Sequence, residues 1–150
     1  MVQAFPEGGY GWHLGRTQSG WMNRHSVGLE ICSFGALSND AKTYTGSKVT
    51  DSEVAHLKEE FRGKLKYHKY SEKQIVETEK WIRYVGERDG IDVRLGLKQF
   101  IQKYGPTKGF GFQMEASTGK VKGLLTHTNV RLDKSDCYPD PDFVDMILSL

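Results

Sequence analysis

Hydrophobic and polar residues alternate most regularly in HSVGLEICS, residues 25–33. The large apolar residues Val27, Leu29 and Ile31 fall on one side of an extended chain, which predicts a strand whose apolar face packs under helices. Glu30 falls on the other side, among small residues. From this pattern alone, Glu30 either rises from the floor of a cleft or faces open water on a half-exposed sheet.

The segment SEKQIVETEKWIRYVGERDG, residues 71–90, shows the spacing of a helix that buries one face. Ser71 and Gln74 have the residue types and spacing of a capping box, so we expect the helix to begin there. Either Gly86 or Gly90 is expected to end it. The residues expected on the buried face are Ile75, Thr78, Ile82 and Val85.

Two more helices are predicted toward the C-terminal end. The segment VRLGLKQFIQKYGP, residues 93–106, has apolar residues at helical spacing and ends in a Gly-Pro stop. The other helix is expected to begin where Asp140 precedes Pro141. The inner positions are Val93, Leu97, Phe100, Ile101 and Tyr104 in the former and Phe143, Val144, Ile147 and Leu150 in the latter.

The remaining pattern is less regular. Residues 35–52 are loop-like, residues 53–61 suit a short helix and residues 64–70 suit a short strand. The segment GLLTHTNV, residues 123–130, predicts a buried strand. Because strands and helices alternate, we expect residues 1–150 to form one α/β domain with helices on a central sheet.

Composition fits a folded domain and narrows the classes of function. The 150 residues are 37% hydrophobic and 27% charged, which suits one globular core. The net charge of +2 is too small to point to nucleic acid as a partner. No apolar run spans a bilayer and no signal peptide is evident, so a cytoplasmic location is expected. Cys32 and Cys137 are expected to be reduced thiols.

Candidate chemistry is concentrated in THTNVRLDKSDCYPDP, residues 126–141. His127 is expected at the end of a strand, where α/β folds usually build their sites. Its imidazole nitrogen and the carboxylate oxygen of Asp136 are both good zinc ligands. In an extended loop Lys134 would point the same way as Asp136, where its charge could stabilise an oxyanion. Cys137 is an alternative ligand, but two adjacent residues do not readily face one ion.

The spacing alone leaves a second interpretation open. A histidine near aspartates is usually not a metal ligand, so the segment can equally be a polar surface loop. A catalytic zinc also takes three protein ligands and one open position for water, and this segment offers two.

Three separated motifs occur in a fixed order along the chain. They are GWHLGRTQSGWMNRHSVGLEICSFG at residues 11–35, YSEKQI at residues 70–75 and the segment at residues 126–141. Together they resemble zinc-dependent N-acetylmuramoyl-L-alanine amidases of the type-2 fold, which include phage endolysins and are related to peptidoglycan recognition proteins. The resemblance covers most of the chain and is weakest over residues 36–66 and 105–120. In the first motif the matching residues are Trp12, His13, Gly15, Asn23, Ser26, Val27, Gly28, Leu29 and Glu30.

This resemblance implies a central mixed β-sheet flanked by helices. It also implies hydrolysis of the amide between N-acetylmuramic acid and L-alanine in peptidoglycan. His127 and Asp136 would be two of the three ligands of a Zn²⁺ cofactor. Lys134 would stabilise the tetrahedral oxyanion, and Glu30 would act as general base toward the attacking water.

The resemblance also assigns binding residues and a partner. Trp12 and His13 would line the substrate groove near the stem peptide, while Asn23 would brace the turn into the Ser26 strand. The partner would be bacterial peptidoglycan, with no nucleic acid and no membrane insertion. A phage lysis enzyme of this kind would accumulate in the cytoplasm of the infected or host bacterium and act on the cell wall after release.

One expected element of the amidase family is not evident. In the family the first zinc-binding histidine precedes the Trp12-His13 element, on an early strand. Here the residues Val2 to Phe5 suggest a strand that has already begun at Met1, and this segment contains no histidine. We therefore expect an N-terminally incomplete domain, completed by a missing N-terminal segment or a partner chain. The alternatives are a degenerate domain that binds muramyl peptides without cutting them, or a third ligand from His13 or Cys137.

Overall fold

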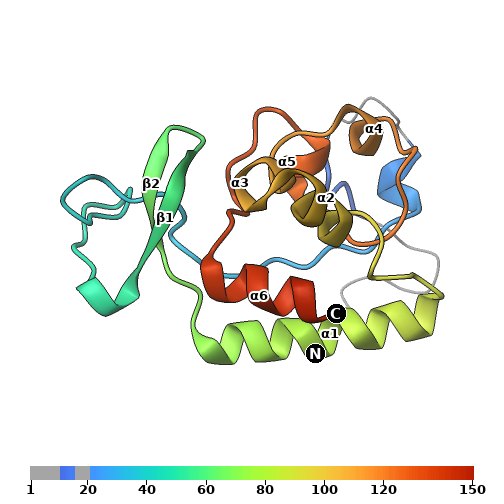
Figure 1. Cartoon of the computed structure of the whole chain (residues 1–150), viewed down its shortest axis with the longest axis horizontal. Helices are drawn as coiled ribbons and strands as arrows, with labels where there is room; N and C mark the ends of the chain where they lie inside the picture. Colours follow the sequence, from blue (N-terminus) through green and yellow to red (C-terminus); the bar gives the residue numbers. More distant parts are fainter. Residues whose placement is uncertain (1–10, 16–20) are drawn as a thin grey trace.

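The computed structural model describes residues 11–15 and 21–150, and the strand expected at Val2 to Phe5 lies outside them. The described chain is a mixed α/β structure (Figure 1). Its strands β1 (Val54–Phe61) and β2 (Lys64–His68) form an antiparallel hairpin. The helices are α1 (Glu72–Asp89), α2 (Leu97–Tyr104), α3 (Pro106–Gly109), α4 (Met114–Ser117), α5 (His127–Val130) and α6 (Pro141–Ser149), with 3₁₀ turns at Met22–Arg24 and Asp51–Glu53.

The described residues contain no central mixed sheet, which corrects the prediction from sequence. Residues 26–32 are extended, but they pair with no strand of the described chain (Figure 1). Val27 and Leu29 are 47% and 41% exposed, and of the three alternating residues only Ile31 packs against the core. Alternation determines which side chains share a face, but a strand also needs a neighbouring backbone to supply hydrogen bonds.

The segment expected to be a short helix is instead strand β1. Val54, Leu57 and Phe61 are buried at positions that also suit a helix, which explains the wrong prediction. Arg62 and Gly63 have φ values of 52° and 73°, and positive φ at both positions suits a tight two-residue hairpin turn. This turn pairs β1 with β2, and β2 confirms the strand predicted there.

Helix α1 confirms its sequence signals. The backbone N–H of Gln74 donates to Oγ of Ser71 at 3.2 Å, and the backbone N–H of Ser71 donates to Oε1 of Gln74 at 2.9 Å. This reciprocal capping box begins the helix, and Gly90 ends it with a left-handed φ of 66°. The expected inner face is buried at Thr78, Ile82 and Val85 and partly buried at Ile75.

The other two predicted helices form with changed limits. Helix α2 begins at Leu97 because the preceding residues form a turn, in which the Leu95 N–H donates to the Asp92 carbonyl at 3.1 Å. Helix α6 begins at Pro141 with Asp140 as its N-cap, as predicted. Of the residues expected on the inner faces, Leu97, Ile101, Phe143, Val144 and Ile147 are buried, Val93, Phe100 and Leu150 are partly buried, and Tyr104 is 44% exposed.

The buried strand predicted over residues 123–130 does not form. Leu124 makes a single parallel bridge with Gly96, and α5 begins three residues later. The hydroxyl of Thr126 accepts a hydrogen bond from the backbone N–H of Asn129 at 3.2 Å. This side-chain cap competes with strand pairing and starts a helical turn.

Three stacked tyrosines occupy the centre of the main core. Tyr138 lies between Tyr67 and Tyr70, with ring centroids 4.3 and 4.7 Å away, and all three are at most 1% exposed. The hydroxyl of Tyr138 donates to the backbone carbonyl of His68. The stack therefore joins the hairpin, the start of α1 and the closing segment of the chain.

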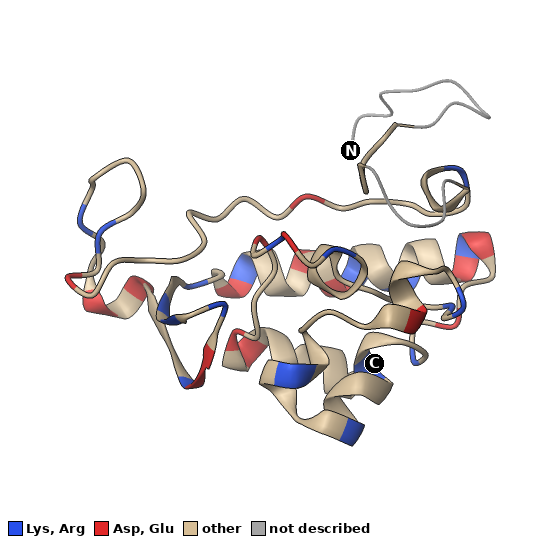
Figure 2. Ribbon diagram, turned by 90° about the horizontal axis from the view of Figure 1, so that it is seen from above, with Lys and Arg blue, Asp and Glu red and all other residues tan. Residues whose placement is uncertain are grey.

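Two further properties bear on the partner. Figure 2 shows basic and acidic residues interspersed along the described elements rather than separated by sign. Among the described helices, none has the length and apolar character needed to cross a membrane.

The tyrosine stack predicts a specific alkaline behaviour. Burial raises the pKa of Tyr67 to about 12 and raises the pKa of Tyr70 and Tyr138 as well. Unfolded tyrosines ionise near pH ~10, so above that pH the unfolded state alone loses these protons and the free energy of unfolding falls. We expect an ultraviolet absorbance titration to show three fewer ionised tyrosines at about pH 11 in the folded than in the denatured protein. Equal numbers of ionised tyrosines in the folded and the denatured protein would contradict the burial of the three stacked rings.

Candidate functional site

The short helix α5 rests on a fixed base. Thr128 and Asn129 are fully buried. Nδ2 of Asn129 donates to two backbone carbonyls of residues 109–111, at 2.8 and 2.7 Å, and the hydroxyl of Thr128 donates to a third at 2.7 Å. Thr128 and Asn129 directly follow His127 in α5. Because their buried hydrogen bonds hold this helical turn in place, the position of His127 is fixed too.

His127 and Asp136 are in direct contact. Nδ1 of His127 lies 2.8 Å from Oδ2 of Asp136, although the residues are nine positions apart. Their side chains are 18% and 48% exposed. An ionised Asp136 can only accept, so Nδ1 of His127 carries a proton and donates it to Oδ2. Within the described chain, Nε2 of His127 is buried and has no hydrogen-bond partner.

The surrounding charges keep Asp136 ionised. Burial by itself would raise its pKa, but the hydrogen bond and charge of His127, with a smaller contribution from Lys134, hold the pKa below its ordinary value. Lys134 is half-buried on the same loop. Arg131 pairs with Asp133, with Nη2 2.6 Å from Oδ2, and this hydrogen bond raises the pKa of Arg131. The loop therefore presents a charged carboxylate near the cations Lys134 and Arg131.

Cys137 is on the opposite side of the chain from Asp136. Its side chain packs against the main core, and burial raises the pKa of its thiol to about 12. In this arrangement Cys137 is a core residue and does not substitute for Asp136.

An imidazole nitrogen and a carboxylate oxygen are ligand types that suit zinc. Two ligands do not complete a zinc site, however, and the described residues contain no group of three His, Cys, Asp or Glu side chains that could hold a metal ion. Glu30 and His13 are thus not gathered around His127 and Asp136. An ion held by both residues would replace their mutual hydrogen bond, and its third ligand would come from outside the described residues.

Asn23 organises the first motif. It is 1% exposed, and its Oδ1 accepts from the backbone N–H of Leu14 at 2.9 Å while its Nδ2 donates to the carbonyl of Gly15 at 2.9 Å. Asn23 therefore braces the turn at residues 12–15, rather than the turn into the segment that begins at Ser26. The same turn leaves Trp12 66% exposed.

His13 is held by other residues of the same motif. Its Nε2 lies 2.9 Å from Oγ of Ser26, and its Nδ1 lies 3.1 Å from the carbonyl oxygen of Gly11. A Cβ atom at Gly28 would come within 2.9 Å of the ring, so the glycine is needed for this close approach. Gly11, Ser26 and Gly28 of the first motif thus together fix the orientation of the His13 ring.

Arg131 links the first motif to the closing one. Its Nη1 donates to the carbonyl oxygen of Leu14 at 3.3 Å. A Cβ at Gly15 would lie 2.5 Å from the same Nη1. The sequence pattern gives no sign of this role of Arg131, because a contact across 117 positions leaves no local signal. Glu30, by contrast, is exposed on the unpaired extended segment and lies apart from these contacts.

Comparison with protein-family models, with curated proteins and with solved structures finds no match in any of the three.

The base beneath α5 predicts a large effect of one substitution. In Asn129→Ala the two carbonyls of residues 109–111 and the backbone N–H of Thr126 lose a buried partner. We expect the free energy of unfolding to fall by about 2–4 kcal/mol, measured by chemical denaturation. Asn39→Ala, in an exposed loop, is the matched control and should change little. Equal losses in the two variants would show that Asn129 does not hold the site.

Proposed function

We propose that this chain is part of a zinc-dependent N-acetylmuramoyl-L-alanine amidase that cuts bacterial peptidoglycan, as a phage lysis enzyme acting on the cell wall after release. The observation that carries the proposal is the 2.8 Å contact between His127 and Asp136. The amidase resemblance assigns these two residues to one metal site, and the fold brings them together. Lys134, from the same motif, is close enough to lower the pKa of Asp136.

Zn²⁺, when bound, would supply a Lewis acid that polarises the amide carbonyl and makes water nucleophilic at neutral pH. His127 and Asp136 would hold it in place of their mutual hydrogen bond. In residues 1–10 and 16–20, Glu7 is the only residue with a His, Cys, Asp or Glu side chain. The third ligand would come from outside the described residues.

The other residues have separate roles in this proposal. The ammonium of Lys134 stabilises the negative charge that develops on the carbonyl oxygen. Glu30 accepts the proton of the attacking water. For that role the extended residues 26–32 would have to join a sheet and face the pair, as in the central mixed sheet of the amidase family. Trp12, which is 66% exposed, and His13 would line the substrate groove near the stem peptide.

A second candidate function is favoured by one observation. Because the described residues gather no three metal ligands, the chain suits a module that binds muramyl peptides without hydrolysis. Such a module would keep the braced turn at residues 12–15 and the exposed Trp12, and it would need no zinc.

Incubation of the complete protein with zinc and purified peptidoglycan tests the hydrolase. We expect new free amino groups of L-alanine. Lys134→Ala should lower the rate about 10²–10³-fold, because it removes an oxyanion donor. Asp136→Ala should abolish the reaction. Lys48→Ala, an exposed lysine on a distant loop, is the control and should retain the full rate.

The outcomes separate the two functions. If the complete protein with zinc releases no L-alanine amino groups, the amidase proposal fails. Sedimentation of the protein with insoluble peptidoglycan, again without release, would support the binding module. Absence of both release and binding would exclude peptidoglycan as the partner.

A further inference from the structure

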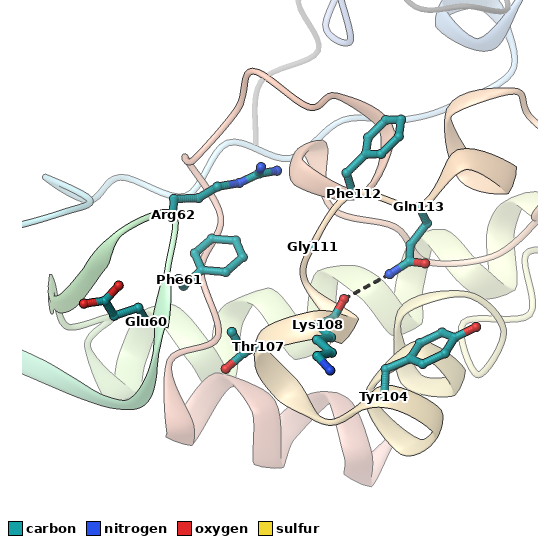
Figure 3. Close-up of a pocket in the computed structure, with 9 residues that line it drawn as sticks. All are labelled: Glu60, Phe61, Arg62, Tyr104, Thr107, Lys108, Gly111, Phe112 and Gln113. Carbon is teal, nitrogen blue, oxygen red and sulfur yellow. Dashed lines mark hydrogen bonds between the residues drawn. The ribbon is translucent and has the colours of Figure 1, made fainter.

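The pocket between the tip of the hairpin and α3 is open, with a volume of about 410 Å³ (Figure 3). Its arginine does not serve a ligand there, because Nε and Nη2 of Arg62 are buried and the Phe61 ring is 3% exposed. Two exposed lysines, Lys42 and Lys48, lie instead on the loop at residues 38–50. This loop is at the end of the molecule beside the hairpin, away from α5 (Figure 1).

The backbone of this loop is held in a fixed shape. The backbone N–H of Thr43 donates to the carbonyl of Ser47 at 2.8 Å, and that of Val49 donates to the carbonyl of Ala41 at 3.0 Å. Thr43 is 5% exposed, and its hydroxyl accepts from the backbone N–H of Ser47 at 3.2 Å. A small apolar cluster lies beneath the loop and consists of Leu37, Ala41, Val49 and Val54. The residues on the outer side of the loop are therefore positioned by a buried base.

Lys42 and Lys48 are directly opposite each other. They form an antiparallel bridge that lies between the two backbone hydrogen bonds of the loop. In a bridge of this kind the two Cβ atoms are about 4.5–5.5 Å apart and both side chains share one face. Like charges at such positions are unfavourable, whereas opposite charges would stabilise the pair.

No counter-ion for the two lysines is provided by the described chain. None of its ion pairs involves Lys42 or Lys48, and the carboxylate of Asp40, two positions before Lys42, is not paired with either. A like-charged pair on a fixed loop is explained if an anion binds between the two ammonium groups.

An aromatic surface adjoins the lysine pair. Because Thr43 is buried, its neighbours Lys42 and Tyr44 both face outward, and Tyr44 is 82% exposed. Its ring centroid is 6.1 Å from that of Phe34, which is 41% exposed. Phe34 in turn contacts the ring of His68 edge-on, with centroids 5.1 Å apart. A flat or apolar group beside the anion can therefore pack against exposed rings.

The number of positive charges indicates the class of anion. A phosphate monoester carries a charge of about −1.5 to −2 at neutral pH and has three strong acceptor oxygens. A carboxylate or a sulfate ester carries a single negative charge. Lysine binds phosphate as a point charge with three rotatable donors, so two opposed lysines suit one doubly charged phosphate group.

We propose that Lys42 and Lys48 bind the phosphate group of a phosphate monoester with an aromatic body. Each ammonium group donates to a phosphate oxygen, and the body packs against Tyr44 and Phe34. The site shares no residue with the His127–Asp136 pair and is independent of the proposed amidase function, so failure of either proposal leaves the other standing.

NMR titration of the full chain with phenyl phosphate tests the site, with the side-chain signals of the lysines as the readout. We expect the signals of Lys42 and Lys48 to shift saturably. Lys48→Gln should lower the affinity at least fivefold. Lys120→Gln makes the same change at an exposed lysine after α4 and should leave the affinity unchanged. Unchanged affinity of Lys48→Gln, or an equal loss in Lys120→Gln, would overturn the proposal.

Two further ligands separate the charge from the aromatic body. Phenyl sulfate has the same ring and one negative charge, and it should bind at least fivefold more weakly than phenyl phosphate. Tyr44→Ala should weaken the binding of phenyl phosphate but not that of inorganic phosphate. Equal binding of the sulfate and the phosphate would contradict a site for a doubly charged group. Equal effects of Tyr44→Ala on both phosphates would contradict the aromatic body.

Thermal unfolding at low ionic strength tests the repulsion between the two lysines. Without ligand, Lys42→Gln should have a higher thermal midpoint than the wild type, because it removes one of two opposed like charges. With saturating phenyl phosphate the order should reverse, because the wild type alone binds the ligand tightly. A lower midpoint of Lys42→Gln without ligand would show that the lysine serves the fold, and this would overturn the proposal.

Discussion

Tyr138 stacks between Tyr67 and Tyr70 and thereby joins three segments that are far apart in the sequence. These segments are the hairpin, the residue before the N-cap of α1 and the closing loop. Asp140 strengthens the same junction, because it caps α6 and accepts from the backbone N–H of Tyr70 at 3.4 Å. With Cys137 and Tyr138 turned into the core, Asp136 is directed outward.

The geometry of the candidate site is determined by two fixed points, one at each end of a loop. At one end, Asn129 and its buried hydrogen bonds fix α5 and thereby His127. At the other, the tyrosine stack fixes the residue two positions after Asp136. The loop between them closes with the imidazole against the carboxylate, and Arg131 attaches the turn at residues 12–15 to it. The pair is thus positioned by the fold rather than by the polar loop itself.

Local signals were sufficient where a structure is specified by neighbouring residues. The Ser71–Gln74 capping box and the Asp140–Pro141 start both act within one helical turn, and both predictions are confirmed. The proximity of His127 and Asp136 was implied by the resemblance to the amidases, since the spacing alone also allowed a polar surface loop. Their role as zinc ligands remains a proposal.

Signals that depend on distant residues could not be interpreted in the same way. Alternation at residues 26–32 predicted a strand, but the described chain offers no backbone beside it. The spacing of the buried residues in β1 also suits a helix. The positive φ values of Arg62 and Gly63 form the tight turn that makes β1 one strand of a hairpin. The unpaired guanidinium of Arg62 likewise follows from the meeting of the hairpin with residues near α3, which no local pattern encodes.

Nitrogen NMR of the histidine rings during a zinc titration of this chain tests the His127–Asp136 pair directly. Before zinc is added, we expect a hydrogen-bonded Nδ1–H on His127. Excess zinc should then shift the ring nitrogens of His127 but not those of His25 or His56, and Asp136→Asn should weaken the response. If the signals of His127 do not move, or respond equally in Asp136→Asn, the two residues do not form a zinc-binding pair.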